Sequence, residues 1–110
     1  MGKFSRDKGY RVENNLRKQI LKHEKMECIR VPLSGGASIR GDLIFNKIGG
    51  EKWYAEVKAR ADGFKNIYKW KDDHEVLIIK ADNKKALAIV DLDDFITLLK
   101  EQSLKTRLRS

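Results

Sequence analysis

The amino-acid sequence predicts a single domain of the α/β class, with several short strands between a first and a last helix. Three observations predict it. Apolar residues recur at helical spacing near both ends of the chain, a β-rich hairpin pattern occupies its centre, and short apolar runs follow that hairpin. A length of 110 residues suffices for one modest hydrophobic core. No repeat, linker or low-complexity segment divides residues 1–110, so one domain is expected.

A first helix is predicted over about residues 5–25, because apolar side chains recur there at every fourth position. They are Val12, Leu16 and Ile20. Residues 28–33 then form a predicted short strand, and Pro32, the only proline of the chain, marks an edge or an exit of that strand. The polar, glycine-containing sequence SGGAS follows as a loop.

The stretch DLIFNKIGGEKWYAEVKA contains two β-rich runs around a Gly-Gly pair at positions 49–50, as expected for a hairpin. A hairpin centred on this pair places Asp42 opposite Glu56 or Val57. Because side chains alternate along a strand, Glu56 and Lys58 share one face and the apolar residues take the other. The hairpin therefore brings two carboxylates together on a polar face.

The second half of the chain predicts a short helix within residues 62–73, where lysines and aromatic residues interleave. That pattern fits a DNA-facing surface or an amphipathic helix with solvated lysines. The apolar runs 75–81 and 85–92 are typical of core strands that are covered on both faces. A helix with an acidic start follows from about residue 91. From about residue 102 a basic tail follows, for which disorder is one expectation.

The composition restricts the function classes. A formal charge of +8 attracts polyanions, most often nucleic acid, and a small-molecule substrate would rarely need so much charge. No run approaches the roughly 18 apolar residues that a membrane span needs, and the polar N-terminus lacks a signal-peptide core, so a cytoplasmic protein without membrane contact is expected. With one cysteine and two histidines, a zinc cage is implausible, and any metal must be held mainly by oxygen.

The element order, the acidic hairpin and the Glu56-Val57-Lys58 triplet resemble the PD-(D/E)XK nuclease superfamily. Within it, the closest likeness is to the small Holliday junction resolvases of archaea and phages. The resemblance extends from GYRVENNL through LSGGASIRGDLIF and YAEVKAR to the last strand. It implies a restriction-endonuclease-like fold, a mixed central β-sheet flanked by helices. It also implies a homodimer that binds four-way DNA junctions and cuts them by paired nicks, in recombination and repair, with Mg²⁺ or a substituting Mn²⁺. A phage-encoded enzyme of this kind would act in the host-cell cytoplasm.

Carried over by position, the resemblance implies a metal site of Glu13, Asp42 and Glu56, with Lys58 as the fourth catalytic residue. Gly41 stands where proline usually precedes the aspartate. Ser34 corresponds to the mobile serine loop of the resolvases. Candidate DNA contacts are Arg6, Arg11, Ser34, Arg40 and Arg60.

The chemistry of the residues supports the same site. Hydrolysis of a phosphodiester requires charge neutralisation and a hydroxide near neutral pH, and hard divalent ions held by carboxylates provide both. Lys58 can orient the attacking water or stabilise the developing charge. Glu13 can reach the metal directly or through water; alternatively it is an exposed helix residue paired with Arg17 at i+4. The rival functions are another repair or nicking nuclease of the superfamily and a non-catalytic nucleic-acid-binding module. The second is less favoured, because clustered acidic residues would repel a polyanion and contribute nothing to binding it.

Overall fold

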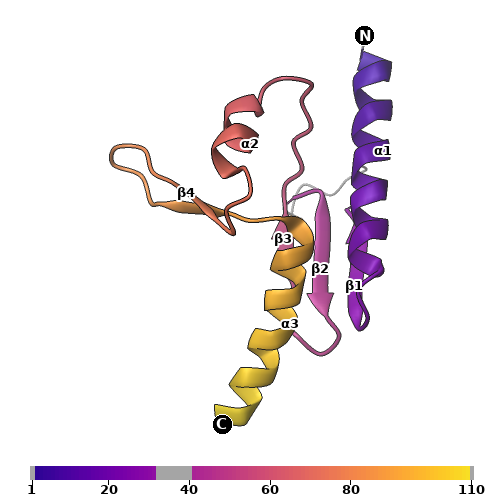
Figure 1. Cartoon of the computed structure of the whole chain (residues 1–110). Coiled ribbons are helices and arrows are strands. Elements are labelled where there is room, and N and C mark those ends of the chain that lie inside the picture. The colour runs from indigo at the N-terminus through magenta and orange to yellow at the C-terminus, as the bar shows by residue number, and fades with distance from the viewer. Residues whose placement is uncertain (1, 32–40, 110) are drawn as a thin grey trace.

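The structure is a computed structural model that describes the backbone of residues 2–31 and 41–109 and the side chains of residues 9–31 and 41–101. The elements in chain order are α1 (Gly2–Leu21), β1 (Met26–Arg30), β2 (Leu43–Lys47), β3 (Trp53–Ala55), α2 (Lys65–Lys71), β4 (Leu77–Ile79), β5 (Leu87–Ile89) and α3 (Leu92–Arg109) (Figure 1). The predicted α/β class is confirmed, and so is the type of each predicted helix and strand. The predicted loop SGGAS lies outside the described residues. Residues 104–109, expected as a tail, continue α3.

Strands β1, β2 and β3 form an antiparallel sheet in that order. The register places Leu43 opposite Ala55 and Phe45 opposite Trp53, so the predicted hairpin around positions 49–50 is confirmed. Its turn closes through a bond from the Gly50 N–H to the Lys47 carbonyl at 2.7 Å, and Gly49 takes a positive φ of 85° that an L-residue rarely adopts. One face of this sheet carries the buried apolar residues Met26, Cys28, Leu43 and Phe45, whereas Ile29 and Ile44 lie on the other face.

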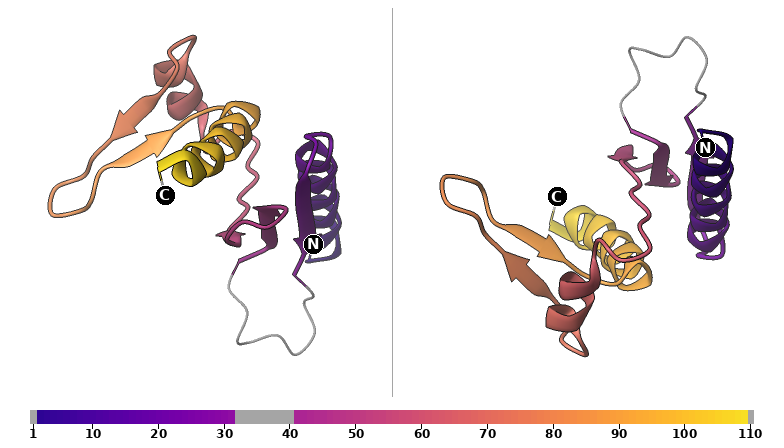
Figure 2. Two further views of the ribbon diagram at one scale, coloured as in Figure 1. Left: turned by 90° about the horizontal axis from the view of Figure 1, so that it is seen from below. Right: turned by 90° about the horizontal axis from the view of Figure 1, so that it is seen from above.

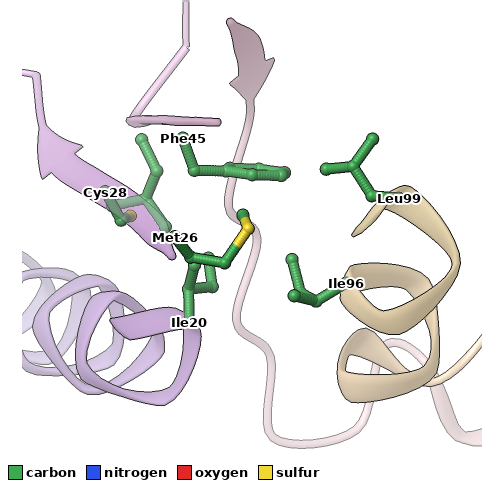
Figure 3. Close-up of a cluster of buried hydrophobic side chains, with 7 residues drawn as sticks. Ile20, Met26, Cys28, Phe45, Ile96 and Leu99 are labelled. Carbon is green, nitrogen blue, oxygen red and sulfur yellow. The ribbon is translucent and has the colours of Figure 1, made fainter. Parts of the chain in front are cut away.

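Helices α1 and α3 both contribute to the core on that apolar face. The buried cluster comprises Ile20 of α1, Met26 and Cys28 of β1, Leu43 and Phe45 of β2, and Ile96 and Leu99 of α3. Figure 3 shows side chains from the two helices meeting over the sheet residues. The Phe95 ring of α3 also packs edge-on against Phe45 and Trp53, with ring centroids 6.2 and 5.3 Å apart. The first and last helices are therefore joined through the sheet.

Strands β4 and β5 form a separate antiparallel hairpin. Both views of Figure 2 place this hairpin on the far side of α3 from α1. Ile78 is 67% exposed and Leu87 is 60% exposed, so the prediction that both runs are covered core strands is wrong. The physical reason is that the two strands pair with each other and no described element covers both of their faces. The projecting hairpin also raises the Cα radius of gyration to 15.9 Å, above the roughly 13 Å of a compact domain of this size.

The sheet arrangement differs from the implied mixed central sheet, because the described strands form two antiparallel sheets and no parallel pair. After β3 the chain leaves the first sheet, and it returns to the core only at α3. Lys71 at the end of α2 is buried and forms a 3.6 Å ion pair with Asp91, which ties α2 to the start of α3. The result is a small α/β protein with antiparallel sheets, an arrangement that does not by itself define a nuclease fold.

Within the described parts of the chain, no helix combines the length and the apolar character that crossing a bilayer requires.

Candidate active site

Asp42 lies at the entrance of β2 and is held by three hydrogen bonds. Its N–H donates to the Ala55 carbonyl at 2.7 Å, and its carbonyl accepts from the Val31 N–H at 2.9 Å. Its side-chain Oδ2 accepts a third bond, from the Val57 N–H at 2.7 Å. A backbone donor to a carboxylate is worth about 1.5–3 kcal/mol, because the acceptor is charged. The carboxylate of Asp42 is therefore fixed beside the backbone that links Glu56 to Lys58.

Gly41 makes this position of Asp42 possible. Its φ of 81° lies in the left-handed region, and a Cβ built on it would be 2.7 Å from the Ala55 carbonyl oxygen. Proline is restricted to a φ near −65°. A proline at position 41 would thus be incompatible with this backbone.

Glu56 and Lys58 lie just beyond β3, in an extended segment whose exposure still alternates residue by residue. The register of the hairpin ends at Leu43 and Ala55, and Asp42 bonds to Ala55 and Val57, the residues on either side of Glu56. Lys58 Nζ donates to Glu56 Oε2 at 2.6 Å, and both side chains are more than half exposed. An exposed pair of this kind is worth about 0–1 kcal/mol, so other ligands can displace either partner at little cost.

Glu13 lies on the inner side of α1. It pairs with an arginine of β1 and does not join the expected cluster of acidic residues. Arg30 Nε donates to Glu13 Oε1 at 3.2 Å, and the guanidinium also stacks on the Tyr10 ring with 4.0 Å from Cζ to the centroid. The Glu13 and Arg30 side chains are only 17% and 22% exposed. The alternative partner Arg17 instead donates to Asn14. The pairing with Arg30 could not be read from helix spacing, because it depends on how α1 packs against β1.

A groove joins Glu13 to the E-V-K segment. It has a volume of about 340 Å³ and is lined by Gly9, Val12, Glu13, Val57, Lys58, Ala59, Arg60 and Ala61. A Cβ at Gly9 would meet no atom within 4 Å, so this glycine leaves the wall of the groove open. The sequence prediction missed Gly9 and Arg30; a glycine inside an amphipathic helix was the available signal for the first.

Three of the four predicted catalytic residues line two separate hollows: Glu13 and Lys58 line the groove, whereas Glu56 lines a second hollow with Gly41. Among the described residues, no three His, Cys, Asp or Glu side chains gather to hold a metal ion. Glu13 is paired with Arg30 through one carboxylate oxygen, and its role as a metal ligand stays a prediction. Asp42 and Glu56 would fit a site of two carboxylates, because Asp42 bonds to the residues on either side of Glu56. Mg²⁺ commonly takes one or two carboxylates from protein when substrate phosphates supply further ligands.

The predicted DNA contacts are divided between described and undescribed parts of the chain. Arg11 is exposed on α1, and Arg60 lines the groove beside Lys58. The Arg6 side chain, Ser34 and Arg40 lie outside the described residues. In α2, Tyr68 and Trp70 are exposed whereas Lys71 is buried, which leaves both interpretations of that segment open.

Comparisons with protein-family models, with curated proteins and with solved structures found no significant match to this chain. The fold and the candidate site define the chain as a small basic α/β protein. In it, an aspartate that follows a left-handed glycine is hydrogen-bonded between the two members of an exposed glutamate-lysine pair.

Proposed function

We propose that this protein is a metal-dependent, structure-selective endodeoxyribonuclease that resolves four-way DNA junctions by paired strand nicks. The observation that carries the proposal is the carboxylate of Asp42, fixed against the Val57 N–H between the exposed Glu56 and Lys58. A groove lined by Lys58 and Arg60, together with Glu13, lies next to them. Constraints of independent origin agree here: the hairpin register, the left-handed glycine and the E-V-K triplet.

Each residue of the site has a role that follows from its position. Asp42 is held before any ligand arrives, so it needs no reorganisation to act as an anionic ligand. Lys58 can exchange its exposed Glu56 partner for a phosphate oxygen and stabilise the charge that develops during hydrolysis. Asp42 and Glu56 would hold the Mg²⁺ or Mn²⁺ ion. When bound, such an ion supplies charge neutralisation and acidifies a water molecule.

Pairing of cuts requires two copies of the site. One site of this kind cuts one strand, whereas resolution of a four-way junction needs two symmetry-related cuts. A two-fold homodimer meets this requirement, because an isologous interface presents identical sites to opposed strands. The net charge of +8 supplies the attraction to DNA, and phosphate contacts fixed in the dimer would set the geometry of the arms.

A non-catalytic nucleic-acid-binding module is the second candidate, and the Glu13–Arg30 pair favours it. This pair engages one carboxylate oxygen of Glu13, an expected metal ligand. A repair or nicking nuclease of the same superfamily would use the same residues and differ in its substrate.

The deciding experiment incubates the protein with a mobile four-way junction, a Y-fork and a linear duplex, each with Mg²⁺, with Mn²⁺ or with EDTA, and then maps the cut strands. Junction resolution predicts paired, metal-dependent cuts on opposed strands. Cuts in the fork or duplex alone identify another nuclease. Binding without cuts under all metal conditions identifies the binding module.

A further inference from the structure

A second concave surface lies away from the candidate active site, between the last turns of α1 and the first turn of α3. This open groove, of about 830 Å³, is lined entirely by polar side chains. They are Asn15, Lys18, Gln19, Lys22, His23 and Asp93. None of these residues contributes to the catalytic set, and the groove is a candidate site in its own right.

The lysines of the groove belong to a longer basic stripe on α1. Arg11, Asn15, Lys18 and Lys22 are all exposed and follow one another at intervals of four, three and four residues, which places them along one side of the helix. The core side of α1, which carries Ile20, lies well round the helix from this stripe. Four successive positions therefore present donors and no acidic group to solvent.

The far wall of the groove is held by a hydrogen bond between two side chains. His23 Nε2 lies 2.8 Å from Asp93 Oδ1, which connects the turn after α1 to the first turn of α3. Hydrogen bonds from His23 and Gln19 hold the pKa of Asp93 below its usual value, so this carboxylate is ionised at neutral pH. Asp93 is the one acidic residue in the lining of the groove. Its negative charge opposes the positive charges of Lys18 and Lys22.

We propose that this groove binds the phosphate backbone of nucleic acid, through Lys18 and Lys22, with Asp93 limiting its affinity. The donors of the lining, two ammonium groups and two amides, match phosphate oxygens. An anionic membrane surface is the less fitting partner, because interfacial helices place aromatic or aliphatic side chains beside their basic residues and the lining of this groove has none.

The position of the groove indicates which part of the DNA it contacts. At a rise of 1.5 Å per residue, Lys22 lies about 13.5 Å along α1 from Glu13, and the nine-residue separation turns it to the opposite side of the helix. The groove therefore binds DNA outside the cleaved strand segment. This inference rests on the proposed function, and it predicts an effect on binding that is separate from any effect on the rate of bond cleavage.

The test is the salt dependence of binding to a labelled four-way junction in EDTA, measured by fluorescence anisotropy. Lys18→Gln with Lys22→Gln should make the log–log slope shallower by about 1.8, because each lost phosphate contact removes about 0.9. The control is Lys84→Gln with Lys85→Gln, which removes the same charge from an exposed loop. An equal change in both double variants would overturn the proposal, since it would reflect net charge alone.

A variant that binds the junction more tightly would distinguish phosphate recognition by the lysines from a purely structural role. Asp93→Asn keeps a side-chain oxygen for His23 but removes the opposing charge, so junction affinity at low salt should rise about two- to fivefold, the effect of one charge about 4–8 Å from a phosphate in water. Unchanged or weaker binding by a variant with wild-type thermal stability would contradict the proposal. The proposal would also be contradicted if wild type and the Lys18/Lys22 variant bound DNA equally and differed only in their binding to anionic lipid vesicles.

Failure of this inference and failure of the nuclease proposal are distinguishable. Wild-type protein that binds DNA through Lys18 and Lys22 but cuts nothing with Mg²⁺ or Mn²⁺ refutes only the nuclease. Wild-type protein that cuts, with binding unaffected by the Lys18/Lys22 substitutions, refutes only the groove. If both hold, the Lys18/Lys22 variant should cut at the wild-type single-turnover rate once the junction is saturated.

Discussion

Among the described glycines, Gly41 should be the one at which substitution by alanine destabilises the protein most. Gly41 and Gly49 both take a positive φ, of 81° and 85°. A Cβ at Gly41 would lie 2.7 Å from the Ala55 carbonyl oxygen, whereas a Cβ at Gly49 would meet nothing within 4 Å. The two positions therefore share the backbone strain, and only Gly41 adds a steric collision.

The expected magnitudes follow from these contacts. The left-handed conformation costs an alanine about 1–2 kcal/mol, and this is the whole expected effect of Gly49→Ala. At Gly41 the colliding atom belongs to the backbone of β3, so relief requires separation of Asp42 from the strand. That movement endangers the Asp42 bonds to Ala55 and Val57, of which the charged one alone is worth about 1.5–3 kcal/mol. Gly41→Ala should thus lower the free energy of unfolding by about 2.5–5 kcal/mol.

Urea denaturation of the two variants, followed by far-ultraviolet circular dichroism, measures the difference. The extrapolated free energy of Gly41→Ala should fall at least 1 kcal/mol below that of Gly49→Ala. DNA cleavage should be lost in Gly41→Ala at temperatures where the variant is still folded, and retained in Gly49→Ala. Equal destabilisation of the two variants would refute the proposed close approach of residue 41 to β3.

Four further outcomes are expected from the same structure. Asp42→Asn should abolish cleavage while junction binding persists. Lys58→Ala should slow single-turnover cleavage by about 10²-fold or more, as for the loss of a preorganised electrostatic group. Normal cleavage rates in these variants would exclude Asp42 and Lys58 from the chemistry. Gly9→Ala should raise the free energy of unfolding by about 0.8–1 kcal/mol, because the site is inside α1 and free of contacts; urea denaturation would detect a contrary loss. Burial raises the pKa of Cys28, so the unfolded chain loses its thiol proton first and stability should fall as the pH rises above about 9; Cys28→Ala should remove this part of the alkaline slope in denaturation experiments.

Local patterns were sufficient to predict the part of the fold that positions Asp42. The Gly-Gly pair, flanked by alternating β-rich runs, specifies both the turn and the register, because a shift of one residue would move every apolar side chain to solvent. The same alternation placed Glu56 and Lys58 on the exposed face, as observed. The apolar period of α1 likewise identified Leu16 and Ile20 as core residues. In each case the necessary information lies within a few residues of the element.

The remaining features depend on contacts between distant segments. The apolar pattern of β4 and β5 is the same whether a sheet, a helix or a second molecule covers them, so it could not distinguish a central strand from the exposed hairpin around Ile78. The pairing of Glu13 with Arg30 likewise depends on the packing of α1 against β1. The sequence therefore predicted Glu13 as a metal ligand and gave no indication that Arg30 would form an ion pair with it.

The glycine at position 41 changes the weight of the motif resemblance. Absence of the superfamily's proline weakens a comparison of letters, yet a proline could not adopt the φ of 81° that position 41 takes here. The glycine also lets the Ala55 carbonyl approach more closely than any side chain would allow. The carboxylate of Asp42 then receives its hydrogen bond from Val57, in the middle of the E-V-K triplet. The departure at position 41 is consequently part of the geometry that supports the site.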